Sequence, residues 1–240
     1  MEGGLHPIYG DTDSLFLDNP DEEEVDSLIQ TVKERLRLDL AVDERYSVCV
    51  LPRAMKAYFG IRRDGTHDIK GVTAIKSNSP QFIQKVFMDC IKEMREVKNQ
   101  EDFEEVKSQI QGIVRDAITN LKAGRVSLRD LEYSVELHED PQAKIEEQVF
   151  HQPYQCALQL IDSGQRVRRR DVVRFVKVKP FSYRGRTFTV KPTEHVKNIQ
   201  EVNIEDYMRN LRTALNQTFK PMDLQFGVEV EGRVTLSDFL

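Results

Sequence analysis

Two aspartates separated by one residue, Asp11 and Asp13, are the side chains in this sequence best suited to do chemistry. They lie between short apolar segments at residues 5–10 and 14–17, which we expect to form two strands joined by a tight turn. Two carboxylates at such a turn can reach the same side of the chain, where their charges repel unless a cation lies between them. Mg²⁺ prefers oxygen ligands of this kind, and a pair of such ions supports in-line displacement at phosphorus. The pattern therefore predicts a divalent-cation site.

The residues that follow predict the elements that must position this turn. Asn19 is expected to cap a helix, because Pro20 and acidic residues follow it and apolar residues then recur at helical spacing as far as Leu36. An Asp-Gly pair at residues 64–65 indicates a hairpin turn between two later strands. The expected strands are residues 46–51, 57–61 and 68–75.

The second part of the chain has a different character. We expect an α+β fold in which residues 1–78 are β-rich with one covering helix and residues 79–240 are mostly helical with a small mixed α/β subdomain. A helical hairpin is predicted to run from Ser79-Pro80 to about Gly124, because apolar residues recur there at helical spacing. The other expected elements are strands at residues 131–137, 172–178 and 186–190, helices at 154–161 and 204–219, and a tail at 226–240.

Composition restricts the class of protein. The 240 residues carry 40 acidic and 35 basic side chains, a formal net charge of -5, and the hydrophobic and charged fractions are ordinary for a folded domain. No apolar run reaches the roughly 18 residues that span a bilayer, and no signal-peptide pattern begins the chain. The three cysteines are widely spaced among apolar residues, which favours buried thiols in a reducing cytoplasm over disulfides or a metal site.

The charge is segregated along the chain. Residues 53–76 contain six basic and two acidic side chains, residues 92–150 contain nine basic and fourteen acidic, and residues 164–191 contain ten basic and one acidic. Local basic stretches attract polyanions whatever the total charge is. We therefore expect the first and last of these stretches to face a nucleic acid, and the last includes Arg168, Arg169 and Arg170.

The string Tyr-Gly-Asp-Thr-Asp-Ser at residues 9–14 resembles motif C of the family B DNA polymerases. In that family the motif forms the palm hairpin that carries metal-binding aspartates. The resemblance implies catalytic and metal-binding roles for Asp11 and Asp13, and two Mg²⁺ ions whose coordination is completed by an aspartate of a partner chain. It also implies that residues 1–78 are the C-terminal part of a palm domain and residues 79–240 a thumb domain.

Further matches follow motif C in the order that the family has. Lys56 and Tyr58 resemble a Lys-x-Tyr element that contacts the primer–template duplex, and Lys70-Gly71 resembles a Lys-Gly element of the same region. Lys76 and Ser77 resemble a basic-polar segment at the palm–thumb junction that touches the primer strand. The resemblance implies that these residues bind DNA through the backbone rather than by reading base sequence.

Motifs A and B of the family, which supply another metal-binding aspartate and hold the incoming deoxynucleoside triphosphate, do not occur in this sequence. We expect a larger partner chain to carry them, so that this chain is inactive alone. A methionine eight residues before Tyr9 resembles the start of the small subunit of a split archaeal family B polymerase. An isolated fragment of an intact polymerase is the alternative.

The last residues suggest a further partner. Leu236, Phe239 and Leu240 resemble the end of a sliding-clamp interaction box within residues 233–240, and a tail that packs on its own chain is equally compatible with them. Two other functions stay open for the chain as a whole: a non-catalytic duplex-DNA-binding processivity module, and an unrelated Mg²⁺ phosphotransferase. The second is disfavoured because no glycine-rich phosphate loop occurs.

Overall fold

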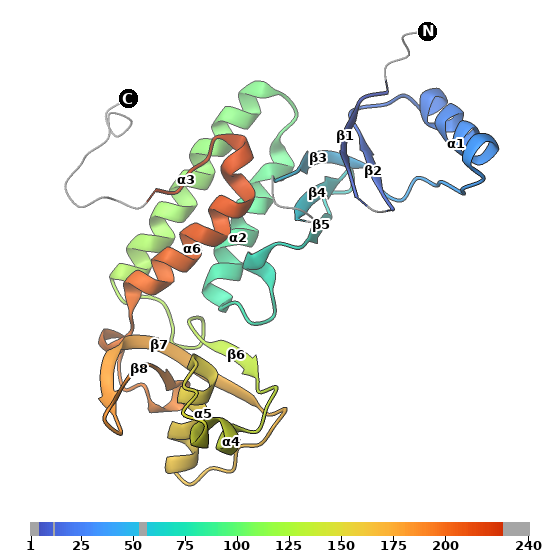
Figure 1. Ribbon diagram of the computed structural model, residues 1–240. Helices are drawn as coiled ribbons and strands as arrows, with labels where there is room; N and C mark the ends of the chain where they lie inside the picture. Colours follow the sequence, from blue (N-terminus) through green and yellow to red (C-terminus); the bar gives the residue numbers. More distant parts are fainter. Residues whose placement is uncertain (1–4, 12, 53–56, 228–240) are drawn as a thin grey trace. The chain divides into compact units, whose positions relative to one another are not determined.

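The computed structural model describes residues 5–11, 13–52 and 57–227, and it divides the chain into two compact units (Figure 1). The first unit is Met1–Gly71 and the second is Val72–Leu240. The predicted boundary between residues 78 and 79 falls a few residues later, just before the helix that begins at Gln81. Among the described residues, no helix is long and apolar enough to cross a membrane.

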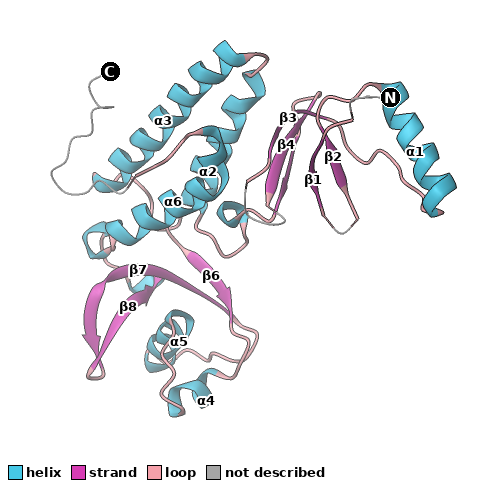
Figure 2. Cartoon of the chain, turned by 45° about the horizontal axis from the view of Figure 1, so that its top comes forward, coloured by secondary structure: helices cyan, strands magenta, loops and turns pink. Residues whose placement is uncertain are grey.

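The first unit contains a two-stranded hairpin, one helix and a three-stranded antiparallel sheet of order β3-β4-β5 (Figure 2). Its elements are β1 (Pro7–Gly10), β2 (Leu15–Leu17), α1 (Glu22–Leu36), β3 (Tyr46–Val50), β4 (Tyr58–Arg62) and β5 (His67–Lys70). The Asp-Gly turn lies between β4 and β5 as predicted, with Gly65 at φ +79. The strand expected over residues 68–75 ends at Lys70, because Gly71 has φ +62 and a 3-10 turn, Thr73–Ile75, follows.

Helix α1 begins two residues later than the sequence suggests. Its N-cap is Asp21 and not Asn19: the Asp21 carboxylate accepts from the Glu24 backbone N–H at 2.7 Å, and the Glu24 side chain accepts from the Asp21 N–H. Asn19 has φ +40 in the turn before the helix. Both residues have a glutamate three residues later, Glu22 and Glu24, but the structure forms the capping box at Asp21, because Asp21 has the extended backbone of an N-cap and Asn19 does not.

The second unit begins with a bundle of three helices, α2 (Gln81–Glu93), α3 (Gln100–Lys122) and α6 (Ile204–Phe219), which lie side by side (Figures 1 and 2). The apolar stripes that the sequence predicts face inward: Cys90 on α2 and Ile110 on α3 are completely buried, as is Leu211 on α6. Helix α3 ends at Lys122, close to Gly124 as expected, and Gly124 has φ +68 and lies against the Ile199 side chain. Short 3-10 turns, Met94–Glu96 and Lys220–Met222, border the helices.

A mixed subdomain is inserted between α3 and α6. It has an antiparallel sheet of order β6-β7-β8 with helices α4 and α5. Its core includes Leu137, Cys156, Phe175 and Val190. The sequence analysis missed α4, a short helix whose Asp140 cap and following proline are a start signal. The elements are β6 (Tyr133–Glu136), α4 (Pro141–Glu146), α5 (Gln152–Asp162), β7 (Val172–Tyr183), β8 (Arg186–Pro192) and the 3-10 turns Thr193–His195 and Ile199–Glu201.

Buried polar side chains fasten this subdomain together and to the bundle. Gln159 donates to the Val190 carbonyl at 2.9 Å, which joins α5 to β8. The Tyr207 hydroxyl, completely buried on α6, donates to the Leu131 carbonyl at 2.6 Å and accepts from the Lys177 N–H at 3.0 Å. Each of these bonds joins residues far apart in sequence, so the positions of helix and sheet depend on them.

Two of the three cysteines are buried as the sequence predicts, and all three are free thiols. Burial raises the pKa of Cys90 and of Cys156 to about 12, so both thiols stay protonated and unreactive near neutral pH. Cys49 is only half-buried, and burial raises its pKa to about 11. In the part of the chain that the structure describes, no three potential metal-ligating side chains form a cluster.

Candidate active site

The two predicted metal ligands lie at the turn of the first hairpin. Strand β1 pairs with β2 in the register Tyr9 to Phe16 and Gly10 to Leu15, and the Asp11 N–H donates to the Ser14 carbonyl at 2.9 Å to close the turn. Asp11 is half-buried and Asp13 exposed, while Thr12 between them is outside the described residues. The structure thus brings both carboxylates to one tight turn, as the apolar segments on either side of them predict.

This donor set is suited to part of a hard-cation site. Two carboxylates are oxygen ligands of the type that Mg²⁺ binds, and Mg²⁺ usually takes only one or two carboxylates and completes its shell with water and phosphate oxygens. No third acidic, histidine or cysteine side chain joins them within the described ranges. The residues therefore fit a site that is completed by ligands from outside this hairpin.

The second group of predicted residues lies on the sheet of the same unit. Tyr58 on β4 and Lys70 on β5 are directly opposite each other in the antiparallel register. Tyr58 is half-buried and Lys70 exposed, with 59% of its side chain accessible. Cross-strand partners have neighbouring side chains, so the structure brings these two together. Lys56, predicted to act with them, lies outside the described residues.

An aromatic chain connects this sheet to the hairpin of the aspartates. Phe16 on β2 contacts Tyr9 edge-to-face, with ring centroids 5.5 Å apart, and Tyr58 in the same way at 5.1 Å. Its ring also lies parallel to that of Tyr46, at 6.5 Å. Such contacts fix ring positions as well as bury area. Phe16 therefore docks the hairpin on the sheet that carries Tyr58.

The sequence analysis missed the polar residues around Tyr58. Asp68 accepts a hydrogen bond from the Tyr46 hydroxyl at 2.8 Å and one from the Tyr58 hydroxyl at 3.4 Å. Burial, together with the neighbouring Asp68 carboxylate, raises the pKa of Tyr46 well above its usual range, and burial also raises the pKa of Tyr58. Asp68 precedes Lys70 by two residues, which puts both on one face of a strand. The spacing of two residues within an expected strand could therefore have identified Asp68 as a neighbour of Lys70.

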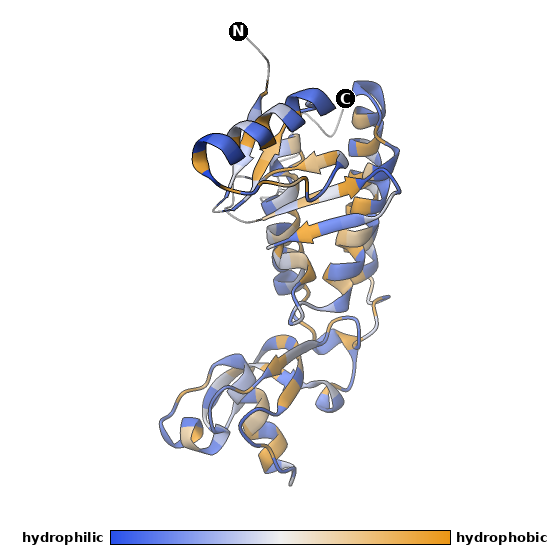
Figure 3. Cartoon of the chain, turned by 90° about the vertical axis from the view of Figure 1, so that its right-hand side faces the viewer, coloured by the Kyte–Doolittle hydropathy of each residue, from blue (hydrophilic) through white to orange (hydrophobic). Residues whose placement is uncertain are grey.

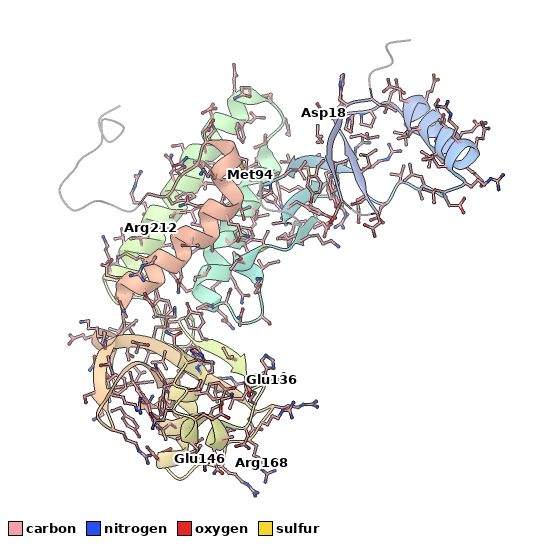
Figure 4. The ribbon with its side chains drawn as sticks, viewed as in Figure 1. Asp18, Met94, Glu136, Glu146, Arg168 and Arg212 are labelled. Carbon is pink, nitrogen blue, oxygen red and sulfur yellow. The ribbon has the colours of Figure 1, made fainter. Side chains whose placement is uncertain are left out.

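The other predicted DNA-binding residues belong to the second unit. Lys76 and Ser77 are exposed in the loop before α2, where the Lys76 carbonyl accepts from the Ser79 N–H at 2.8 Å. Arg168, Arg169 and Arg170 are exposed in the turn before β7, and Figure 4 labels Arg168 there.

The arginine turn has a defined backbone. The Arg168 N–H donates to the Asp171 carboxylate at 2.7 Å, the Arg170 N–H donates to the Leu137 carbonyl at 2.7 Å, and Arg170 has φ +70. The Arg169 guanidinium donates to the His138 carbonyl at 2.8 Å. The one acidic residue of the basic stretch thus organises the turn, and the three arginines are presented on a fixed loop.

Comparison with known proteins assigns the chain to a family. The model of DNA polymerase family B matches residues 2–222, and the chain belongs to that family. It is similar to DNA polymerase 1 of Sulfolobus acidocaldarius, with 35% identity over 98% of this chain and 26% of that protein. The same holds for DNA polymerase 1 of Saccharolobus solfataricus, with 33% identity over 99% of this chain and 26% of that protein.

A solved structure gives the same assignment. The family B DNA polymerase of the hyperthermophilic archaeon Pyrobaculum calidifontis matches 97% of this chain and 28% of its own, with a TM-score of 0.67 and 25% identity. The chain thus spans about a quarter of the length of the curated relatives named above. The mixed fold with antiparallel sheets agrees with the α+β prediction.

Proposed function

We propose that this chain contributes one part of the active site of a replicative DNA-directed DNA polymerase. In this proposal residues 1–78 are the C-terminal part of the palm and residues 79–240 the thumb. A larger partner chain carries motifs A and B and supplies the missing aspartate. The observation that carries the proposal is the hairpin turn with Asp11 and Asp13 in a chain of family B.

Asp11 and Asp13 would hold Mg²⁺ at the point where the primer end and the incoming deoxynucleoside triphosphate meet. The chemistry that a pair of bound Mg²⁺ ions supplies is activation of an attacking hydroxyl and stabilisation of the leaving pyrophosphate. Tyr58, Lys70 and Lys76 would hold the primer–template duplex without reading its sequence. The last basic stretch, with Arg168 to Arg170, would contact the backbone of the duplex.

The exposed apolar surface of the first unit supports the existence of a partner. No residue of α1 is buried, and Ile8, Leu15 and Leu36 are 52%, 47% and 63% exposed. A contiguous exposed apolar surface is typical of sites that another protein covers, and in our proposal these residues form part of such a surface. Family membership favours the rest of the palm domain, on the partner chain, as the protein that covers this surface.

Removal of Asp13 tests the catalytic role. In the polymerase reconstituted from this chain and the partner, Asp13→Ala should abolish primer extension, because one metal-binding carboxylate is removed. Binding of primer–template DNA should persist, since the DNA-holding residues are intact. Asp18→Ala is a matched control, because Asp18 is an exposed aspartate at the far end of the same hairpin. Full extension by the Asp13 variant would instead favour the alternative, a non-catalytic duplex-binding processivity module.

The tail at residues 233–240 is a second candidate site, with Leu236, Phe239 and Leu240 as sliding-clamp contacts. These residues lie outside the described part of the chain, so the proposal rests on the sequence pattern alone. Deletion of residues 233–240 should reduce the number of nucleotides added per binding event when the clamp is present and leave it unchanged without the clamp. An equal result for the two proteins in the presence of the clamp would contradict the assignment.

A further inference from the structure

One carboxylate joins the three strands of the first unit's sheet through side chains. Asp68 on β5 accepts from the hydroxyl of Tyr46 on β3 and from that of Tyr58 on β4, both through Oδ2. The Lys70 ammonium lies 3.7 Å from the other oxygen, Oδ1. Only 15% of the Asp68 side chain is exposed. A carboxylate so well enclosed is stable because donors surround both of its oxygens.

Tyr46 holds Asp68 in place. A glycine, Gly60, faces its ring on β4: a Cβ at that position would lie 2.3 Å from the ring. The ring can therefore lie across the strand and bring its hydroxyl to Asp68. Because burial raises the pKa of Tyr46, its hydroxyl remains a proton donor to the carboxylate at every physiological pH. Hydrogen bonds to a charged acceptor are among the strong ones.

Asp68 and Phe16 together leave Tyr58 little freedom. The rings of Phe16 and Tyr58 meet edge-to-face, with centroids 5.1 Å apart, and Asp68 accepts from the Tyr58 hydroxyl. Lys70 is restrained by the same carboxylate. Tyr58 and Lys70, the two residues proposed to hold the primer–template, thus both contact Asp68. Tyr58 also contacts Phe16, whose ring contacts Tyr9 in the hairpin of Asp11 and Asp13.

We infer that Asp68 is a positioning residue, which fixes Tyr58 and Lys70 relative to the catalytic hairpin and so sets where the primer strand is held. The inference rests on the proposed DNA-holding function of Tyr58 and Lys70. Asp68 acts through these two neighbours and not by contact with DNA, since a carboxylate repels phosphate. Its negative charge also offsets part of the positive charge of Lys70.

A double-mutant cycle tests the inference in the reconstituted polymerase. Asp68→Asn keeps the size of the side chain but replaces one acceptor by a donor, so the two hydroxyls and Lys70 can no longer all be satisfied. Asp68→Asn and Tyr58→Phe should each weaken binding of a fluorescent hairpin primer–template about three- to tenfold, the range of one or two hydrogen bonds. The maximal rate at saturating DNA should fall as well, because the primer end is then held less precisely at the hairpin of Asp11 and Asp13.

The coupling between the two changes is the decisive measurement. Because Asp68 acts partly through Tyr58, the double variant should lose less affinity than the product of the two single effects. Glu44→Gln is the matched control: it breaks an ion pair with Arg62 in the same unit, 2.6 Å between charged atoms, and should leave the affinity unchanged. Tyr46→Phe removes only the hydrogen bond from the Tyr46 hydroxyl to Asp68. It should weaken DNA binding less than Asp68→Asn does, and it provides a second variant if Asp68→Asn does not fold.

The outcomes separate the inference from the function on which it rests. If Tyr58→Phe weakens DNA binding but Asp68→Asn does not, the positioning role of Asp68 is overturned. The proposed DNA-holding function of Tyr58 and Lys70 then still stands. Independent, multiplying effects also overturn the positioning role, since they indicate that Asp68 does not act through Tyr58. If Tyr58→Phe and Lys70→Ala both bind primer–template with full affinity, the proposed DNA-holding function of these two residues is wrong. The positioning role of Asp68 is then wrong as well.

Discussion

Gly60 has no side chain, and the Tyr46 ring packs into the space that this leaves. A single methyl group at position 60 should be enough to displace the ring. The nearest ring atom would lie 2.3 Å from a Cβ at this position. The displaced ring would no longer donate its hydrogen bond to Asp68. A glycine thereby helps to decide where Asp68 lies, and with it Tyr58 and Lys70, the two residues that we propose to hold DNA.

Gly60→Ala should therefore lower the free energy of unfolding by about 1–3 kcal/mol, the usual cost of overpacking. Gly112 is the matched control, because it lies inside α3 with nothing within 4 Å of a Cβ. Gly112→Ala should raise the free energy by about 0.5–1 kcal/mol, since alanine favours a helix over glycine. Urea unfolding of both variants measures the difference, and equal stabilities would contradict the assigned packing.

At the scale of elements, helix α1 has an apolar face that the described residues do not cover fully. The apolar residues Val25, Leu28, Ile29 and Val32 share one face at helical spacing, yet they are only half-buried. Figure 3 shows the helix coloured mostly as hydrophilic, with hydrophobic residues among the polar ones. The sequence pattern correctly predicts a helix with an apolar face. What covers that face is supplied by another part of the polymerase in our proposal.

An acidic residue on this face should disrupt the association and leave the chain folded. We expect Val32→Asp to prevent co-purification with the partner chain that carries motifs A and B, because it introduces an unpaired charge into an apolar contact. Thr31→Asp introduces the same charge one residue earlier on an exposed position and should not. Circular dichroism should report equal helix content for both. Retention of the partner by the Val32 variant would refute this interface.

At the scale of the whole molecule, the distribution of charge matters more than its sum. A net charge of -5 would by itself disfavour a polyanionic partner. The basic residues nevertheless concentrate in two stretches, and those at residues 168–170 lie on an ordered, exposed turn. Duplex binding by such a molecule depends on local contacts with phosphates, which release counterions.

Replacement of Arg168, Arg169 and Arg170 by alanine should weaken binding of duplex DNA by the reconstituted polymerase and make it less sensitive to salt. The slope of log affinity against log salt should fall by up to about 0.9 for each phosphate that the variant no longer neutralises. A variant with Lys92, Lys98 and Lys107 replaced changes the net charge equally within the acidic stretch and should keep the slope. If the two variants have the same slope, the arginines do not contact DNA.

The sequence by itself determined the local structure and the family of this protein. Strands and helices follow from apolar periodicity and turn residues, so the first hairpin, the sheet and the three long helices could be predicted from segments of a few residues. The helix start at Asp21 is the ambiguous case, because Asn19 and Asp21 each have a glutamate three residues later and only the backbone conformation of the folded chain distinguishes them. The two aspartates that we propose as metal ligands stand out in the sequence because they are close neighbours along the chain.

Only the tertiary structure decided the contacts between residues far apart in sequence. Tyr46 and Asp68 are separated by 22 residues, and Tyr207 meets Leu131 across 76. Such pairs form because strand register and helix packing bring their elements together, and no local pattern specifies them. The folded chain thus adds the carboxylate and aromatic rings that connect Tyr58 and Lys70 with the hairpin of Asp11 and Asp13.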